Sequence, residues 1–242
     1  MQFRKTQFHK LATGLVIAIA MVPAHIRTHR PRAAFWTGRT LCMLKLRLNN
    51  LLAHQSCAIT VITPTFKRLD ALAEAIASVR AQEFQDWEHL IVADGHDPDV
   101  ERLVSSYADK RLVYISTKPF HCSGNHQRNV ALAASKAKYV YFLDDDNILY
   151  PHALGAMLAG FEAPDVDYVV GPSEMDDHSV LSPSPNFALG EIDTLNFMIR
   201  RKACGEVGGW RRIYFADFLL IDSIRKRHKG KHLDIRPVGI HR

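Results

Sequence analysis

From residue 58 onward, short apolar runs alternate with stretches of helical periodicity, and this alternation constrains the fold more than any other feature of the 242-residue chain. The runs that suit buried strands are 58–63, 89–94, 111–116, 139–144 and 167–171. The stretches that suit helices are 69–82, 97–107, a segment capped by Ser123 that ends at Ala137, and 151–160. This order predicts an α/β fold in which helices cover both faces of a mostly parallel sheet.

Residues 1–57 differ from the rest of the chain in charge. They contain nine Lys or Arg residues and no Asp or Glu, so residues 58–242 hold 22 basic and 25 acidic residues although the whole chain carries +6. A mildly acidic body argues against a nucleic-acid-binding domain, because phosphate neutralisation needs a basic face. We therefore divide the chain into a basic N-terminal extension, 1–57, and one domain, 58–242.

The N-terminal extension is open to several interpretations. The apolar run 11–24 follows a basic start, as in the core of a signal peptide, but its 14 residues are fewer than the roughly 20 that a membrane-spanning helix needs. The acid-free stretch 25–48 could lie on an anionic membrane surface. Alternatively, much of 1–57 is a poorly ordered extension, or sequence upstream of a start at Met43.

Four cysteines lie far apart in the chain, without a CxxC pair. This pattern indicates neither a disulfide framework nor a zinc ribbon, and it is typical of a reducing compartment. We expect a cytoplasmic protein, with residues 1–57 as the candidate for peripheral contact with the inner face of the membrane.

Polar residues follow the predicted strands at the points where ligands bind in such sheets. The first strand ends in Thr63-Pro64-Thr65-Phe66, the second in Asp94-Gly95, and the fourth in Asp144-Asp145-Asp146. Since parallel strands end at the same edge of a sheet, we expect these residues to meet there.

Three consecutive carboxylates repel one another, so we expect something positive beside Asp144–Asp146. Hard cations such as Mg²⁺ and Mn²⁺ prefer oxygen ligands and often bridge one or two carboxylates to substrate phosphates. An acidic, solvated turn is the alternative. We favour a metal site because the acids follow a buried strand and Asp94 occupies the analogous place.

Five ordered motifs give the segment 58–242 a resemblance to family 2 glycosyltransferases of the GT-A type, which use nucleotide-sugar donors. These motifs are ITPTFKR at 62–68, IVADG at 91–95, Arg128-Asn129 with Ala131, FLDDD at 142–146, and Tyr150-Pro151. The resemblance implies a Rossmann-like α/β fold and transfer of a sugar, with a UDP-sugar as the expected donor. The departures are Ala93, where the family often has a first Asp, and His96 after the glycine.

For the nucleotide, the resemblance implies that Pro64 and Thr65 line the pocket and that Asp94 hydrogen-bonds the base, expected to be uracil. Arg128 would either position the donor or pin its own helix to the sheet.

For the metal, the resemblance implies Mn²⁺ or Mg²⁺ with Asp146 as the direct ligand. Asp144 and Asp145 would approach the ribose or metal-bound water. His241, near the end of the chain, is a second candidate ligand, with a solvated side chain as the alternative.

In the second half, Asp217 falls where the family keeps the acid that serves as general base in inverting members, although Ala216 replaces the preceding Glu. Asp222 is a second candidate base. A helix N-cap is the structural alternative for Asp217, because Asp is favoured there. Residues 196–201 could form a further strand, and the turn ending in Gly208-Gly209-Trp210 resembles one near the acceptor.

The leading hypothesis is therefore an inverting, metal-dependent glycosyltransferase that acts on a saccharide or lipid-linked acceptor. A nucleotidyltransferase is disfavoured because the chain contains no GxGxxG or GxxxxGK[ST] phosphate loop. A non-catalytic sugar-nucleotide-binding or scaffold protein of the same fold is the third hypothesis, since Ala93 and Ala216 stand where acids are expected.

Overall fold

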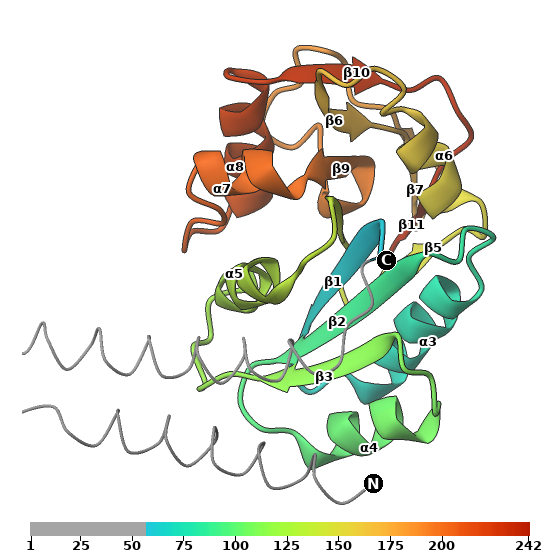
Figure 1. The fold of residues 1–242 in the computed structure, drawn as a ribbon, viewed down its shortest axis with the longest axis vertical. Coiled ribbons are helices and arrows are strands. Elements are labelled where there is room, and N and C mark those ends of the chain that lie inside the picture. Colours follow the sequence, from blue (N-terminus) through green and yellow to red (C-terminus); the bar gives the residue numbers. More distant parts are fainter. Residues whose placement is uncertain (1–56) are drawn as a thin grey trace, which may run out of the picture. The chain divides into compact units, whose positions relative to one another are not determined.

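The computed structural model describes residues 57–242, which are built around a seven-stranded sheet (Figure 1). Its strands are β1 (Ile59–Thr65), β2 (Trp87–Ala93), β3 (Leu112–Ser116), β4 (Tyr139–Phe142), β6 (Val166–Val170), β9 (Phe197–Arg200) and β10 (Lys229–His232). They lie in the order β10-β6-β9-β4-β1-β2-β3. Every neighbouring pair is parallel except the two that β9 makes with β4 and β6. The predicted α/β fold with a mostly parallel sheet is confirmed, with one reversed strand in its middle.

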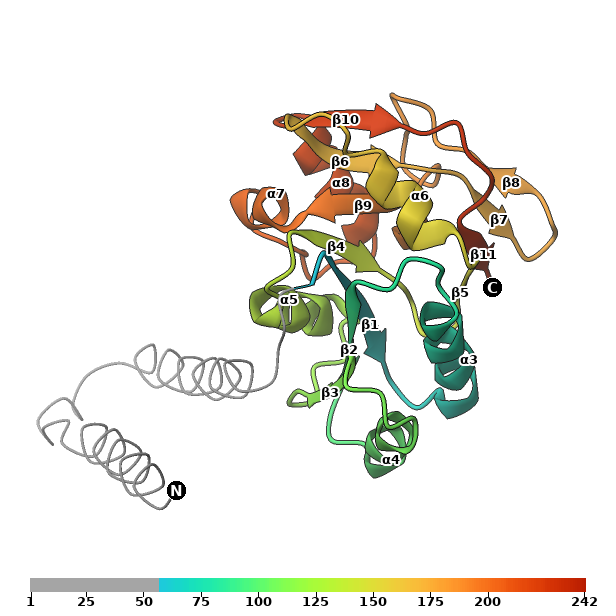
Figure 2. The same cartoon turned by 45° about the vertical axis from the view of Figure 1, so that its right-hand side comes forward.

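Helices cover the sheet on both sides. They are α3 (Leu69–Arg80), α4 (Pro98–Ser106), α5 (Asn125–Ala134), α6 (Ala153–Ala159), α7 (Arg201–Glu206) and α8 (Ala216–Arg225). Figures 1 and 2 show α3 and α4 on one side of β1–β3 and α5 on the other. Because both faces are covered, β1 and β2 are buried along their whole length, and polar side chains such as Thr63 and His89 are buried together with the apolar ones.

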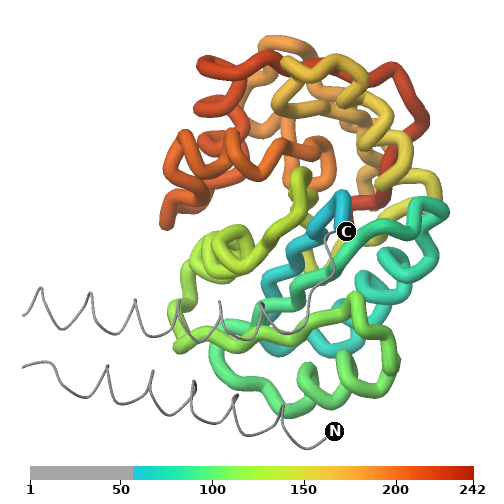
Figure 3. The backbone as a smooth tube through the Cα atoms, viewed as in Figure 1, coloured from blue at the N-terminus to red at the C-terminus, as the bar shows by residue number. Residues whose placement is uncertain are grey.

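A second, four-stranded sheet joins the end of the chain to its middle. It comprises β5 (Ile148–Leu149), β11 (Gly239–His241), β7 (Ser173–Met175) and β8 (Val180–Leu181), in that order. Figure 3 shows the C-terminal segment, in red, running back toward the first half of the domain. There the Arg242 N–H donates to Asn147 Oδ1 at 3.2 Å, and the Arg242 side chain pairs with Glu74.

Strand β1 continues through Pro64, although a proline cannot donate to a ladder. The pairing of β1 with β4 ends at Ile62 and Phe142, whereas its pairing with β2 continues to Thr65. The nitrogen of Pro64 faces the β4 side, as does Ile62, whose carbonyl accepts the Leu143 N–H. The missing N–H therefore costs no strand hydrogen bond.

Helix α5 starts differently from the prediction. Its N-cap residue is Gly124, with φ = +74°, and not Ser123. A Cβ atom at Gly124 would lie 2.7 Å from Pro64 Cβ, so the helix begins where its backbone approaches the end of β1 too closely for a side chain. The start of the helix therefore depends on the contact between Gly124 and Pro64, and not on the capping preference of Ser123.

Within residues 57–242, no helix is long and apolar enough to cross a membrane. The interpretations offered for the N-terminal extension concern residues 1–56, which lie outside the described part of the chain.

Candidate active site

The acids predicted to share one edge of the sheet follow the two strands that flank β1. Strand β1 lies between β2 and β4, with Thr65 opposite Ala93 and Ile62 opposite Phe142. Asp94 therefore follows β2, and Asp144 follows β4 after one residue, at the carboxyl ends of two strands that both run parallel to β1. This is the edge where open α/β sheets bind ligands.

Asp94 holds the loop between β3 and α5. Its Oδ1 accepts the Phe120 N–H at 2.6 Å and its Oδ2 accepts the His121 N–H at 2.7 Å, and the side chain is only 8% exposed. Each carboxylate oxygen keeps a further lone pair, so the same side chain can also accept a hydrogen bond from a bound base.

Pro64 and Thr65 are buried at the end of β1, and the first exposed side chain after them is Phe66. Its ring contacts the His121 ring, with centroids 5.3 Å apart and an interplanar angle of 74°. Phe66 was not singled out from the sequence. The sequence feature that could have identified Phe66 is its position: it is a large apolar residue in the turn after the first strand, where side chains are usually polar.

The three consecutive acids have two arginine partners. Arg128 pairs with Asp144, whereas Arg68 pairs with Asp146 and lies 3.3 Å from Asp145 Oδ1. The predicted positive charge is therefore present as two side chains of the protein itself. Arg68 and Arg128 are distant in sequence from the acids, so only the fold shows that they neutralise them.

The acids differ in accessibility. Asp145 is buried, and this burial raises the pKa of its carboxyl group, while Arg68 opposes the shift. The side chain of Asp146 is 35% exposed, and its partner Arg68 is 56% exposed. Asp146 is thus the more accessible of these two carboxylates to a ligand.

Arg128 connects α5 with the loop before it, with the acids after β4 and with the turn at Trp210. Its guanidinium donates to Ser123 O at 2.9 Å and to Asn125 Oδ1 at 3.1 Å, and it pairs with Asp144. Its Cζ lies 4.6 Å from the centroid of the Trp210 ring. These contacts agree with a role in pinning the helix to the sheet; a role in positioning the donor remains a prediction.

Asn129, the residue after Arg128, holds the turn that leads to α8. Its Oδ1 accepts the Trp210 N–H at 2.9 Å, and its Nδ2 donates to Trp210 O at 2.8 Å. The preceding Gly209 has φ = +72°, and a Cβ there would lie 2.5 Å from Asn129 Oδ1. The Arg-Asn pair of α5 therefore contacts both the acid-bearing end of β4 and the turn before Asp217.

Asp217 lies in the first turn of α8 and is half-buried. Burial raises the pKa of its carboxyl group, and the negative charge of Asp144 adds to the shift, while Arg128 opposes it. The N-cap residue of α8 is Phe215, so Asp217 is not the cap that the structural alternative supposed. A carboxylate with a raised pKa close to other acids suits a general base.

Asp222, the second candidate base, has a different environment. Its carboxylate pairs with Arg225 at 2.7 Å and with Lys226 at 2.6 Å, and these contacts outweigh burial, so its pKa is lowered. Two partners on its own helix favour a structural role for Asp222 and leave Asp217 as the better candidate.

Asp193 joins this group of acids and was missed in the sequence. It caps the short helix η2 (Thr194–Asn196), accepting the Leu195 N–H at 3.1 Å. Burial raises the pKa of Asp193, and the charge of Asp144 adds to this. The spacing of Asp193 and Asn196, which form a capping box, could have identified Asp193 as a helix cap. No sequence pattern around Asp193 indicates that it lies close to the acids after β4.

The predicted metal ligands Asp146 and His241 have separate partners. His241 Nε2 lies 3.6 Å from Asp193 Oδ2, and Asp146 pairs with Arg68. Residues 57–242 contain no group of three or more His, Cys, Asp or Glu side chains placed to hold a metal ion. The accessible carboxylate of Asp146 nevertheless fits one position in the shell of a hard cation whose other ligands are phosphate oxygens and water.

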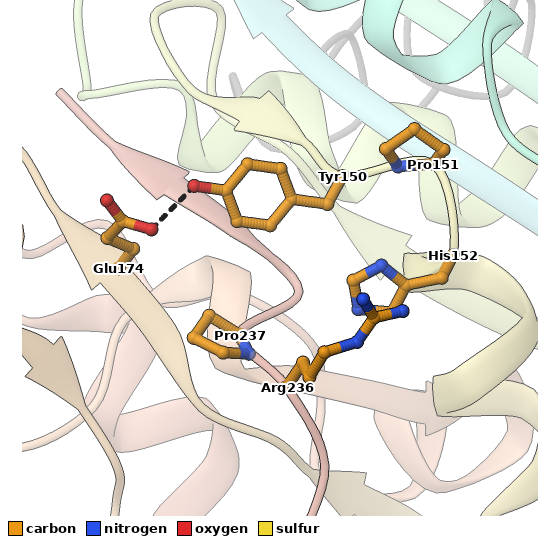
Figure 4. A pocket seen from close by; sticks show the side chains of 6 residues that line it. All are labelled: Tyr150, Pro151, His152, Glu174, Arg236 and Pro237. Carbon is orange, nitrogen blue, oxygen red and sulfur yellow. Dashed lines mark hydrogen bonds between the residues drawn. The ribbon is translucent and has the colours of Figure 1, made fainter.

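A cavity of about 340 Å³ lies beside the four-stranded sheet (Figure 4). It is lined by Tyr150, Pro151, His152, Glu174, Arg236 and Pro237. The Tyr150 hydroxyl donates to Glu174 Oε2 at 2.6 Å, and this hydrogen bond raises the pKa of Tyr150 to about 12. None of the acids described above lines the cavity, so we do not assign the donor to it.

The sheet topology and the grouping of acids at one edge are those of a nucleotide-binding α/β domain. Comparison with known proteins identifies the family. Residues 60–213 match the family described as glycosyl transferase family 2. The chain belongs to this family.

Two relatives illustrate the range of acceptors. A Campylobacter jejuni protein named GalNAc(5)-diNAcBac-PP-undecaprenol beta-1,3-glucosyltransferase is 31% identical over 102 residues, covering 41% of this chain and 33% of the relative. The Staphylococcus aureus poly(ribitol-phosphate) beta-N-acetylglucosaminyltransferase TarP is 29% identical over 137 residues, covering 55% of this chain and 42% of the relative. The chain thus matches less than half the length of either protein.

Solved structures share the fold. S. aureus TarS 1–349 in complex with UDP-GlcNAc has a TM-score of 0.64 at 16% identity, covering 76% of this chain and 58% of that one. Mannosyltransferase PcManGT from Pyrobaculum calidifontis, in complex with GDP-Man and Mn²⁺, has a TM-score of 0.62 at 18% identity, covering 87% and 66%. The GT-A fold expected from the motifs is confirmed.

Proposed function

We propose that this protein is an inverting glycosyltransferase that moves a sugar from a nucleotide-sugar, most simply a UDP-sugar, to a saccharide or lipid-linked acceptor. Membership of glycosyl transferase family 2 supports sugar transfer. A UDP-GlcNAc complex among the structural neighbours supports the donor class. A relative whose name contains an undecaprenol-linked saccharide supports the acceptor class.

One observation carries the proposal: neighbouring residues of α5 join the acids after β4 to the turn before Asp217, because Arg128 pairs with Asp144 and Asn129 bonds the main chain of Trp210. Asp144 comes from the donor motif after β4, and Asp217 from the first turn of α8, 73 positions later in the numbering. A transferase needs its donor and its base close together, because the acceptor oxygen must reach the anomeric carbon while it loses its proton.

In the proposed reaction, Asp217 removes the proton from the acceptor hydroxyl. The oxygen then forms its bond to the anomeric carbon as the bond from that carbon to the diphosphate breaks, and the nucleoside diphosphate leaves. Arg68 and Arg128 offset the charge of the acid triplet, so that a diphosphate can approach this edge of the sheet.

Asp146 would hold Mn²⁺ or Mg²⁺ together with the donor diphosphate, and His241 is the second proposed ligand. A divalent cation supplies stabilisation of the negative charge that builds on a leaving phosphate. Asp144 and Asp145 are proposed to approach the ribose or metal-bound water, Asp94 the base, and Pro64 with Thr65 the wall of the nucleotide pocket.

A cytoplasmic location is part of the proposal. The cysteines at positions 57, 122 and 204 carry free thiols, which suits a reducing compartment. Peripheral contact of residues 1–57 with the inner face of the membrane remains a proposal based on their charge.

A thermal-shift screen tests donor and metal together, because a ligand that binds only the native state raises the melting temperature. The ligands are UDP, GDP and UDP-GlcNAc, each with Mn²⁺ or with EDTA. We expect UDP with Mn²⁺ to give the largest shift. An equal UDP shift in EDTA would remove the metal from the proposal, and a larger GDP shift would replace uracil by guanine.

Transfer itself is tested by release of UDP from UDP-sugars in the presence of mixed saccharide and lipid-linked acceptors. Tight UDP binding with neither transfer nor hydrolysis would favour the non-catalytic alternative.

A further inference from the structure

The segment Arg211–Phe215, between α7 and α8, is exposed along its whole length although it is rich in apolar side chains. Tyr214 is 82% exposed, and Ile213 and Phe215 are each 48% exposed. Figure 1 shows this connection on the side of the domain where α5 lies. Large apolar side chains that stay in water over consecutive positions mark an interaction surface rather than a packing element.

The backbone of the 211–215 segment is held by α5 rather than loose. Asn129 bonds both main-chain groups of Trp210, and Asn125 Nδ2 donates to Ile213 O at 3.1 Å. The guanidinium carbon of Arg212 lies 4.1 Å from the centroid of the Phe120 ring, which is itself 38% exposed. The apolar side chains therefore project from a fixed backbone.

The charge of the segment complements an anionic surface. Among residues 57–242, neither Arg211 nor Arg212 forms an ion pair with a carboxylate. Residues 58–242 carry a small net negative charge, so an anionic surface attracts this edge of the domain while it repels the body as a whole.

We propose that the 211–215 segment docks the protein on an anionic lipid bilayer, with Tyr214, Ile213 and Phe215 entering the interface and Arg211 and Arg212 contacting the headgroups. An aromatic residue with a polar tip, apolar neighbours and arginines is the composition that binds at the boundary between headgroups and acyl chains. Asp217 follows Phe215 by two residues, so docking brings the proposed base to the membrane surface, where a lipid-linked acceptor presents its saccharide. That last step rests on the proposed function; the docking itself does not.

Co-sedimentation of the full chain with vesicles tests the docking. The vesicles contain phosphatidylcholine alone or phosphatidylcholine with phosphatidylglycerol. We expect binding to the anionic vesicles, and a loss of about tenfold or more in the partition coefficient of Arg211→Ala/Tyr214→Ala. The matched control, Arg102→Ala/Val180→Ala, also removes one exposed arginine and one exposed apolar side chain, and it should bind as the unchanged protein does.

A second variant reports insertion directly. Tyr214→Trp should gain tryptophan fluorescence that brominated lipids quench, beyond the quenching of Trp36, Trp87 and Trp210 in the parent protein. Unchanged vesicle binding by the double variant, an equal loss in the control, or no additional quenching would each overturn the proposal. The proposal would also be overturned if the double variant lost binding to soluble polyphosphate but still bound vesicles, because the segment would then bind an anionic polymer instead of a bilayer.

The melting temperature in UDP and Mn²⁺, measured on the same variants, separates this inference from the proposed function. A protein that binds vesicles through the segment but shows no nucleotide-dependent shift would sustain the docking and refute the donor assignment.

Discussion

Asn129 and the main chain of Trp210 exchange two hydrogen bonds, of 2.9 and 2.8 Å, across 81 positions of sequence. Through them, the helix that carries Arg128 fixes the turn before the helix that carries Asp217. The donor edge of the sheet and the proposed base are thus mechanically connected through α5.

Replacing Asn129 should disturb transfer more than nucleotide binding. Asn129→Ala leaves both main-chain groups of Trp210 without these partners, which we expect to lower the free energy of unfolding by about 1–2 kcal/mol. We expect kcat to fall while the affinity for UDP changes less than twofold. Urea unfolding and steady-state kinetics measure the two effects. Asn129→Asp, which keeps the acceptor and loses the donor, should be intermediate; equal losses in kcat and UDP affinity would argue against the connection.

Asp217→Asn should abolish the base while keeping the fold. We expect a fall in kcat of about 10²–10⁴-fold with unchanged UDP binding. Burial disfavours the ionised carboxylate, so the neutral amide should keep or raise the melting temperature at neutral pH. Asp222→Asn is the control in the same helix: it should retain transfer but lose about 1–2 kcal/mol of stability, because Arg225 and Lys226 lose their partner. The reverse pattern would make Asp222 the base.

The pH dependence of transfer should reflect the raised pKa of Asp217. A general base works only when ionised, so kcat should fall as the pH falls through this pKa, with a midpoint above the ordinary value for Asp of about 3.9. Because Arg128 opposes the shift, Arg128→Met should move the acidic limb to higher pH. A midpoint at or below 3.9 would count against Asp217 as the base.

Arg68 and a divalent cation should compete for Asp146. Arg68→Gln removes the cation that now pairs with this carboxylate, so we expect tighter Mn²⁺ binding in the absence of nucleotide, measured by isothermal titration calorimetry. Asp146→Ala should eliminate the part of the UDP melting shift that depends on Mn²⁺. If Arg68→Gln binds Mn²⁺ as weakly as the unchanged protein and Asp146→Ala keeps its shift, Asp146 is not the ligand.

His89 should make the fold sensitive to acid. It is a fully buried residue of β2, with Nε2 at 2.8 Å from Thr63 Oγ1 of β1, and burial lowers its pKa to about 3. As the pH falls below about 6.5, His89 takes up a proton in the unfolded chain but not in the folded one. The unfolding constant should therefore rise by up to tenfold for each pH unit of the decrease, until about pH 3. His89→Gln should flatten this dependence, whatever its effect at neutral pH; an unchanged slope in urea unfolding at several pH values would refute it.

The sequence by itself determined the elements and most of their order. The run 89–94 contains the unbroken apolar stretch 90–93 because covered parallel strands are buried on both faces, and this local signal correctly predicted β2. The acids after β2 and β4 could be assigned to one edge for the same reason, since parallel strands end together. The family motifs then gave each acid an expected role.

Only the tertiary structure decided what surrounds those acids. Arg68 and Arg128 neutralise the triplet, Asp193 joins it from the segment before β9, and Asn129 holds the turn before Asp217; each contact joins residues far apart in the chain. The start of α5 at Gly124 and the reversed direction of β9 likewise depend on neighbours that no local pattern identifies. Periodicity and strand ends are properties of a short segment, whereas charge pairing and close backbone approach exist only once the segments have met.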